Sequence, residues 1–323
     1  MCTAITFQST DHYFGRNLDL EYSYRESVTV MPRNYPLFFR KMPVMQKHYA
    51  MIGVATVSDG YPLFYDGVNE RGLAMAGLNF PGNAVYYPEA ANMDNIAPFE
   101  LMPWVLSQCG TVDDARKLLD RINIEKLPFN KKFPLTPLHW LIADRESAIT
   151  LESLSEGMRI YENPVGVLTN NPTFDFHIHH LQNYLNITSE EPWNRFSEKI
   201  SLSPYSRGMG ALGLPGDLSS SSRFVRAAFT KLNACCGVNE EENVCQFFHI
   251  LDAVAMQKGC VKVGELYEKT VYSSCCNTDK GIYYYTTYEN SRITAVDMYR
   301  ENLEGNELIS YPLRTKLDLC WEN

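Results

Sequence analysis

The chain opens with the sequence Met1-Cys2-Thr3-Ala4-Ile5-Thr6. Because the residue after the initiator is small, Met1 can be removed, and Cys2 would then carry a thiol and a free α-amine on one residue. The pKa of a free α-amine is about 7.7–8.0 and that of a free thiol about 8.5, so such an amine can accept the thiol proton near neutral pH without a histidine. Thiolate is the nucleophilic form of cysteine. The alternative is that Cys2 is only the first residue of an edge strand.

A second polar segment follows shortly after this opening, in the run Phe-Gly-Arg-Asn-Leu-Asp at 14–19. A guanidinium next to a cysteine sulfur favours the thiolate, and a carboxylate can hold the hydrogens of an α-amine in place. Arg16 and Asp19 are therefore candidates for these two tasks beside Cys2. The alternative is a structural Arg–Asp pair in a turn.

The overall composition is that of a globular protein with a substantial core. The chain has 323 residues, of which 45% are hydrophobic and 21% charged. Its length would allow two domains, but no linker separates two halves, so we expect a single domain over 1–323. The formal net charge of −9 argues against nucleic acid or an anionic membrane surface as the main partner.

The chain shows no targeting or membrane-spanning signal. The first basic residue is Arg16, so no basic segment precedes an apolar run, and no apolar run approaches the ~18 residues of a membrane span. We therefore expect a cytoplasmic protein with no membrane partner. The nine cysteines include no C-x-x-C pair, and we expect most of them to be reduced packing residues.

Blocks of strands alternate with blocks of helices, without a regular β-α-β rhythm. This pattern predicts an α+β fold in which helices cover antiparallel sheets. Helices are expected over 98–107, from Thr111 to Ile122, and over 174–184, 221–232 and 240–257. Strands are expected over 2–7, 12–18, 27–31, 49–57, 63–68, 73–78, 138–143, 148–151, 159–161, 166–169, 270–275, 281–288, 293–298 and 308–313.

Two short motifs suggest cofactor or metal chemistry, but neither has the required context. Residues 208–213 match G-x-G-x-x-G, yet no strand precedes them and no helix follows, so we interpret them as a loop. His177, His179 and His180 have no carboxylate or cysteine partners at ligand spacing and are interpreted as a partly exposed helical face. We expect no cofactor and no metal. The loop-rich segment 186–215 is a candidate lid or specificity loop, or surface padding.

With these segments in view, the chain closely resembles the choloylglycine hydrolase family. This family contains bile salt hydrolases and penicillin V acylases, within the N-terminal nucleophile hydrolases. The resemblance is carried by runs that span the chain in order: Met-Cys-Thr at 1–3, Phe-Gly-Arg-Asn-Leu-Asp-Leu-Glu-Tyr-Ser at 14–23, Asn-Glu-Arg-Gly-Leu-Ala-Met-Ala-Gly-Leu-Asn-Phe-Pro at 69–81, Gly-Val-Leu-Thr-Asn-Asn-Pro-Thr-Phe-Asp at 166–175, Leu-Pro-Gly-Asp at 214–217, Ser-Arg-Phe-Val-Arg at 222–226 and Gly-Ile-Tyr-Tyr-Tyr-Thr-Thr-Tyr-Glu-Asn at 281–290.

The resemblance implies a role for particular residues. Cys2 matches the nucleophile, exposed by loss of Met1, and Arg16 and Asp19 match the residues that position its thiol and amine. The remaining matches are Asn79 and Asn170, which shape the oxyanion site, and Arg223, the other active-site arginine. The fold implied is a four-layer αββα sandwich, usually assembled as a homotetramer.

The implied activity is hydrolysis of glycine- or taurine-conjugated bile salts through a thioester on Cys2. An Asn at position 79 resembles bile salt hydrolases, whereas a Tyr there resembles many penicillin V acylases. Apolar residues in the early loops could offer a bed for a sterol, but each could equally be core: Tyr22, Tyr24, Phe64 and Tyr65. Two alternatives stay open, a glutamine amidotransferase, whose Met-Cys-Gly start is absent, and a binding protein of the same fold.

Overall fold

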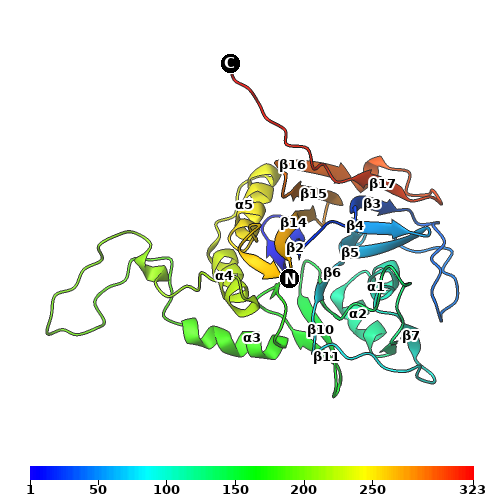
Figure 1. The fold of residues 1–323 in the computed structure, drawn as a ribbon, viewed down its shortest axis with the longest axis horizontal. Helices are drawn as coiled ribbons and strands as arrows, with labels where there is room; N and C mark the ends of the chain where they lie inside the picture. Colours follow the sequence, from blue (N-terminus) through cyan, green and yellow to red (C-terminus); the bar gives the residue numbers. More distant parts are fainter.

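The computed structural model describes residues 1–323 and is built mainly from two antiparallel sheets, of seven and eight strands (Figure 1). In the seven-stranded sheet the order is β12, β1, β2, β14, β15, β16, and β13 pairs with β14 outside this path. These strands span Cys2–Gln8 (β1), His12–Leu20 (β2), Val167–Leu168 (β12), Val261–Val263 (β13), Leu266–Asn277 (β14), Ile282–Thr287 (β15) and Asn290–Asp297 (β16).

The eight-stranded sheet has the order β11, β10, β9, β6, β5, β4, β3, β17. Its strands span Ser27–Met31 (β3), Met51–Ser58 (β4), Tyr61–Asn69 (β5), Ala74–Asn79 (β6), Leu138–Ala143 (β9), Ala148–Leu154 (β10), Gly157–Glu162 (β11) and Ile309–Pro312 (β17). A short parallel pair, β7 (Asp94–Ile96) and β8 (Ile122–Ile124), stands apart from both sheets.

Helices cover the outer faces of both sheets. They span Leu101–Gln108 (α1), Val112–Leu119 (α2), Phe174–Leu181 (α3), Ser220–Asn233 (α4) and Glu240–Asp252 (α5). Apolar residues of α4 and α5 pack into one core with the seven-stranded sheet, and those of α1 and α2 pack onto the eight-stranded sheet. Figure 1 shows the resulting order of helices, sheet, sheet and helices. The predicted αββα sandwich is confirmed.

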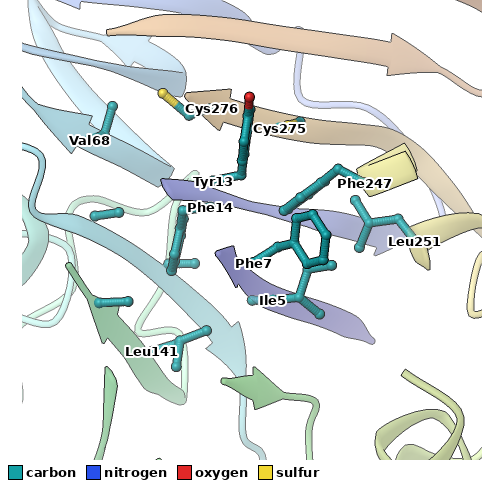
Figure 2. Close-up of a cluster of buried hydrophobic side chains, with 14 of the residues drawn as sticks. Ile5, Phe7, Tyr13, Phe14, Val68, Leu141, Phe247, Leu251, Cys275 and Cys276 are labelled. Carbon is teal, nitrogen blue, oxygen red and sulfur yellow. The ribbon is translucent and has the colours of Figure 1, made fainter. Parts of the chain in front are cut away.

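The first core joins the two sheets to each other and to α5. Phe7 and Tyr13 lie opposite each other on β1 and β2, and both rings pack against Phe247 of α5. Because successive side chains of a strand point to opposite faces, Phe14 lies on the side of Val68 and Leu141, which belong to the eight-stranded sheet (Figure 2). Successive side chains of β2 therefore pack in turn against α5 and against the eight-stranded sheet.

Strand β6 is buried on both faces, which explains its almost continuous apolar sequence. Ala74, Ala76 and Leu78 join the core between the sheets. Met75 points the other way, into a second core that α1 and α2 share with the eight-stranded sheet. The strand that ends at Asn79 is therefore fixed from both sides.

Two predicted helices end earlier than expected. The helix begun at Thr111 is confirmed, and the Thr111 hydroxyl accepts the Asp114 N–H at 3.1 Å, but the helix ends at Leu119 and Ile122 lies in β8. Helix α5 ends at Asp252 because the following backbone is bound by strand β14: Thr270 donates its N–H to the Met256 carbonyl at 3.0 Å. Both helix ends depend on strand contacts with residues far along the chain, so the spacing of apolar residues within the helix does not predict them.

Three further differences concern short or exposed features. The strands β7, β8 and β13 were not expected, and the last turn of the helix predicted to Tyr184 is a 3₁₀ turn over Gln182–Tyr184. All nine cysteines are free thiols, but most are not packing residues, because five are exposed: Cys235, Cys236, Cys245, Cys260 and Cys320. No helix combines the length and the apolar character needed to cross a lipid bilayer.

Candidate active site

Cys2 is the first residue of β1 and is almost completely buried, at 3% exposure. It pairs with Leu18 of β2, and this register brings the polar segment of β2 beside the start of the chain. Arg16 and Asp19 were expected beside Cys2 because of their chemistry, and the antiparallel pairing of two consecutive strands accounts for this proximity. The candidate nucleophile thus lies at a strand end next to Arg16 and Asp19.

Arg16 is fully buried and held by backbone carbonyls. One terminal nitrogen, Nη1, donates to the carbonyls of Tyr65 at 2.8 Å and Gly77 at 2.6 Å, while Nη2 has no partner. Burial opposes the charged form of this guanidinium, but the neighbouring Cys2 thiol, Tyr272 and two aspartates outweigh it and raise its pKa. A permanent positive charge therefore faces Cys2.

Asp19 is also fully buried, with a carboxylate that is only half satisfied. Its Oδ1 accepts the Thr270 hydroxyl at 2.7 Å, and its Oδ2 has no partner. Burial raises the pKa of this carboxyl, against the opposing effect of Arg223 and of the chain's amino terminus. The carboxyl group thus has a free acceptor close to where a terminal amine lies.

Met1 is present in the structure and places its α-amine in a polar recess. The amine donates to the Asp19 carbonyl at 2.9 Å and forms an ion pair with the buried carboxylate of Glu268. The Asp19 N–H donates in return to the Met1 carbonyl at 3.1 Å. Removal of Met1 would vacate these contacts next to Asp19.

The nitrogen of Cys2 donates to the side chain of Asn170, at 2.7 Å from Oδ1. This nitrogen is a peptide amide here, because Met1 precedes it, so the predicted contact of a free Cys2 amine with Asp19 stays a prediction. A strand pairing of β1 with β12 brings Asn170, two residues beyond β12, to this position. The contact joins residues that are 168 positions apart, which explains why spacing did not reveal it.

Arg223, on α4, completes the polar network. Its Nη1 donates to the Cys2 carbonyl at 2.6 Å and to the Thr3 hydroxyl at 2.6 Å, and its Nη2 donates to Asn170 Oδ1 at 2.8 Å. The side chain is fully buried, and burial lowers its pKa against the opposing charges of Asp19 and Cys2. The planar guanidinium thus links the Cys2 carbonyl, the Thr3 hydroxyl and the Asn170 side chain.

Asn79 is the last residue of β6 and lines the same cavity as Cys2 and Arg16. Its carbonyl accepts the Asn170 side-chain N–H at 2.7 Å. The structure therefore brings the residues singled out in the sequence into one place, from β1, β2, β6, the end of β12 and α4: Cys2, Arg16, Asp19, Asn79, Asn170 and Arg223.

A mostly apolar pocket of about 320 Å³ opens onto Cys2, and 15 of its 23 lining residues are hydrophobic. Tyr24, Phe64 and Tyr65 line it, as suggested for an apolar bed, but Tyr22 does not. None of residues 206–213, which lie in the candidate specificity loop, lines it. We call this cavity the Cys2 pocket.

Sequence reasoning missed much of the pocket wall, which comes from one segment between β8 and β9. Its signal is an unusual density of Pro and Phe in the run Leu-Pro-Phe-Asn-Lys-Lys-Phe-Pro-Leu-Thr-Pro at 127–137. The lining residues of this segment are Leu127, Pro128, Phe129, Lys132, Phe133, Pro134, Leu135 and Thr136.

Buried polar residues behind the site were also missed. Asp66 of β5 accepts hydroxyl hydrogens from Tyr272, Tyr283 and Ser274 across the gap between the sheets, at 2.5, 2.5 and 3.0 Å. The only sequence signal is an aspartate inside a β-rich run. His177 was interpreted as part of an exposed face, but it is fully buried and bonds to the Asn170 carbonyl at 2.9 Å.

No group of three or more His, Cys, Asp or Glu residues is arranged to hold a metal ion. What the site does offer is a buried sulfur, two guanidinium groups, a carboxylate and the amide groups of two asparagines, at the end of an apolar cavity. These are the parts needed to attack a carbonyl and to stabilise the negative charge that forms on its oxygen.

Fold and site together define a hydrolase of the N-terminal nucleophile class. The family model for linear amide C–N hydrolases of the choloylglycine hydrolase family matches residues 2–311, and the chain belongs to this family. The predicted resemblance is confirmed.

Two curated relatives cover nearly the whole chain. The chain is 55% identical to the bile salt hydrolase/transferase of Lactiplantibacillus plantarum, over 98% of each chain. It is 38% identical to the bile salt hydrolase/transferase of Clostridium perfringens, over 99% of each.

Solved structures agree with this assignment. A crystal structure of a mutant of the conjugated bile acid hydrolase from Clostridium perfringens superposes with a TM-score of 0.92, at 37% identity and 100% coverage of both chains. Penicillin V acylase from Agrobacterium tumefaciens shares the fold, with a TM-score of 0.75 at 19% identity, over 96% of this chain and 90% of that one.

Proposed function

We propose that this linear amide C–N hydrolase is a bile salt hydrolase, which cleaves the amide bond of glycine- or taurine-conjugated bile salts and releases the free bile acid and the amino acid. The observation that carries the proposal is the apolar Cys2 pocket, which ends at a buried thiol beside Arg16. A sterol is a large apolar group with one reactive arm, and such a pocket fits it. The bile salt hydrolases at 55% and 38% identity support the same substrate class, as the sequence predicted.

The reaction we propose begins with loss of Met1. The Cys2 thiolate attacks the amide carbonyl, and amide groups at Asn79 and Asn170 stabilise the oxyanion, for which one donor can contribute roughly 2.7–4 kcal/mol. The α-ammonium of Cys2 protonates the leaving amine, and the acyl group stays on sulfur as a thioester. Water then attacks the thioester with the α-amine as base.

The polar network around Cys2 supports this sequence of steps. Arg16 offers a fixed positive charge to the thiolate, and its free Nη2 lies in a buried position beside the pocket. Asn170 Oδ1 already accepts a hydrogen from the Cys2 nitrogen, so the α-amine would keep this partner after processing. The free Asp19 Oδ2 could accept a second hydrogen from it.

The proposal is tested by measuring the amine released from taurocholate, glycocholate and penicillin V in direct competition, which is taurine, glycine or the amino group of the β-lactam nucleus. We expect the bile salts to be preferred, and a strong preference for penicillin V would overturn the substrate assignment. Cys2→Ala is expected to abolish turnover without unfolding the protein. Retained turnover in this variant would exclude Cys2 as nucleophile, and would leave a binding protein or another chemistry to be considered.

Processing of Met1 is tested by the intact mass of active protein. We expect a loss of the mass of one methionine residue. In the structure the Met1 residue blocks the Cys2 nitrogen and forms an ion pair with Glu268. Full activity in protein that retains Met1 would rule out a catalytic α-amine.

The names of the two curated relatives also include transfer. We propose that an amine can replace water as the acceptor of the thioester, which gives a new amide and restores the thiol. Incubating the protein with glycocholate and an excess of a second amino acid, followed by mass analysis of the bile acid products, tests this. Free bile acid as the only product would contradict it.

We further propose that residues 1–323 act as one domain, and that the protein is a cytoplasmic homotetramer. The segment between α3 and α4 extends away from the body of the molecule (Figure 1) and exposes apolar side chains that a partner could cover: Leu185, Trp193, Phe196, Tyr205 and Leu212. The mass in solution by light scattering, for the wild type and for Phe196→Ser with Tyr205→Ser, tests the assembly. Cell fractionation tests the location.

A further inference from the structure

A buried imidazole that the proposed reaction does not use lies behind the two asparagines. His139 of β9 is fully buried. Its Nε2 lies 2.9 Å from the Thr169 carbonyl, and its Nδ1 lies 3.1 Å from Glu152 Oε1. A carbonyl oxygen can only accept, so Nε2 carries a hydrogen and donates it to Thr169.

The bond to Thr169 crosses from one sheet to the other. His139 belongs to the eight-stranded sheet, whereas Thr169 directly follows β12 of the seven-stranded sheet. The next residue is Asn170, whose side chain holds the Cys2 nitrogen. His139 therefore fixes the backbone immediately before one asparagine of the site.

The same ring contacts the neighbour of the other asparagine. His139 lies opposite Leu78 in the pairing of β9 with β6, and its ring stacks on Phe80, with centroids 4.1 Å apart and planes 8° apart. Phe80 directly follows Asn79. One side chain thus touches the residue before Asn170 and the residue after Asn79.

Glu152 and α3 prevent this ring from turning. Glu152 of β10 is fully buried, and its Oε1 also accepts the Phe174 N–H, at the start of α3, at 3.0 Å. Helix α3 in turn supplies His177, which bonds to the Asn170 carbonyl at 2.9 Å. Both carbonyls of the Thr169–Asn170 segment are therefore held by imidazoles, and the first imidazole is fixed by a carboxyl group.

We propose that His139, held by Glu152, is a positioning residue that sets the spacing between Asn79 and Asn170. The inference rests on the proposed function, because it concerns the oxyanion site of that reaction. Donors to an oxyanion must lie about 2.7–3.1 Å from the position of the developing charge. A displacement near 1 Å can cost on the order of 10²-fold in rate. A rigid link between the two asparagines therefore acts on the rate of the chemical step.

Two substitutions at His139 distinguish loss of the hydrogen bond to Thr169 from loss of packing around the ring. The amide of His139→Gln can replace Nε2 and keep the bond to Thr169. The amide of His139→Asn can replace Nδ1 and keep the bond to Glu152, but it cannot reach Thr169. We expect kcat for release of glycine from glycocholate to fall about 10- to 100-fold in His139→Asn, with KM within about twofold of the wild type. In His139→Gln most of kcat should return.

The rate of alkylation of the Cys2 thiol serves as a control. A general loss of structure would change this rate, whereas loss of the link through His139 should not. His139 has no contact with Cys2, Arg16 or Arg223, so the rate of alkylation of Cys2 by iodoacetamide at a fixed pH is expected to stay unchanged in both variants. The inference is overturned if His139→Asn keeps wild-type kcat, if alkylation falls in parallel with kcat, or if Gln is as harmful as Asn.

A third variant covers the case in which the polar substitutions do not fold. Phe80→Leu removes the stacked ring but leaves every hydrogen bond of His139 intact, and we expect a several-fold lower kcat with unchanged alkylation. Wild-type kcat in a folded Phe80→Leu variant would contradict the inference. The wild type is measured alongside: if it releases no glycine, the proposed function fails, whereas the inference on His139 fails when the wild type is active and the variants give any of the contrary results named above.

Discussion

At the scale of single residues, the arrangement of the hydrogen-bond donors of Arg223 is more important for the candidate site than its positive charge alone. Arg223 donates from three nitrogens, to the carbonyls of Leu218 and Cys2, to the Thr3 hydroxyl and to Asn170. A lysine at the same place would keep the charge but lacks the planar fork.

We therefore expect Arg223→Lys to lower kcat/KM by about 10²-fold, because the backbone of Cys2 and the side chain of Asn170 lose their common support. Steady-state kinetics on glycocholate measure this, and circular dichroism shows whether the fold is kept. Activity within about threefold of the wild type would mean that charge at this position is sufficient.

Asp66 illustrates a residue whose effect on stability we can predict. Its buried carboxyl accepts three hydroxyl hydrogens from the other sheet and lies near the Arg16 charge. Asp66→Ala leaves these donors and a buried guanidinium without their partner. We expect the free energy of unfolding to fall by about 3–5 kcal/mol in urea titrations. Asp120→Ala, at an exposed position, is the control and should change it by less than about 0.5 kcal/mol.

The polar side chains of the candidate site could be singled out from the sequence, since each carries a chemical group that the proposed reaction needs. The sequence was not sufficient to say which group touches which. Asn170 accepts the backbone N–H of Cys2, because the pairing of β1 with β12 brings these two residues together. His139 and Asp66 lie inside strands with no distinguishing pattern, so only their long-range partners reveal them.

At the scale of secondary-structure elements, β2 and β14 approach each other closely at Gly15. A Cβ atom at this position would lie 1.9 Å from the Ser274 carbonyl oxygen, which belongs to the backbone of β14. The backbone cannot yield there without moving Arg16, the next residue. Glycine is therefore required by the close approach of two strands.

We expect Gly15→Ala to lower both stability and activity, because β2 must shift and carry Arg16 with it. Overpacking of this kind typically costs about 1–3 kcal/mol, occasionally more. Gly216→Ala is a matched control, since nothing lies within 4 Å of its Cβ position. Thermal unfolding and the glycocholate assay measure the two effects. Equal behaviour of the two variants would contradict the account of β2.

Element positions could be predicted where the pattern of side chains is local. The strand expected over 27–31 is observed at Ser27–Met31, and the Thr111 cap begins α2 as predicted. Helix ends and short strands depend on partners elsewhere in the chain. The end of α5 is decided by β14, and β7 exists only because β8 lies beside it.

At the scale of the whole molecule, two buried histidines connect stability to pH. Burial lowers the pKa of His12 and His177 to about 4, from an ordinary value near 6.5. Between these values the unfolded chain binds protons that the folded protein does not, so their contribution to stability is complete above about pH 6.5 and declines as the pH falls toward 4. Buried carboxyls such as Asp19 and Asp66 contribute with the opposite sign, because burial raises their pKa.

A comparison of variants isolates the histidine contribution. His177→Gln can keep the bond to the Asn170 carbonyl and does not titrate. We expect the wild type to lose stability relative to this variant as the pH falls from 6.5 to 4, by up to about 1.4 kcal/mol per pH unit. Urea unfolding across this range measures the difference, and His179→Gln, at an exposed position, should show none. A difference that is independent of pH would contradict a neutral buried His177.

The α+β class could be predicted because blocks of strands alternate with blocks of helices, and the four-layer sandwich because the family resemblance spans the chain. The cavity could not. Eight of its 23 lining residues come from 127–136, whose side chains meet β2, β5 and β6 only in the folded protein.

The placement of the chain ends has a practical consequence for making this enzyme. The Met1 amine lies against Glu268 and Asp19, one residue from the Cys2 sulfur, whereas the last residues extend into solvent (Figure 1). An affinity tag fused upstream would bury its junction in the candidate active site and, in the proposed mechanism, prevent exposure of the Cys2 amine. Purification handles therefore belong downstream of Asn323, and an upstream fusion should be inert until a protease exposes Cys2.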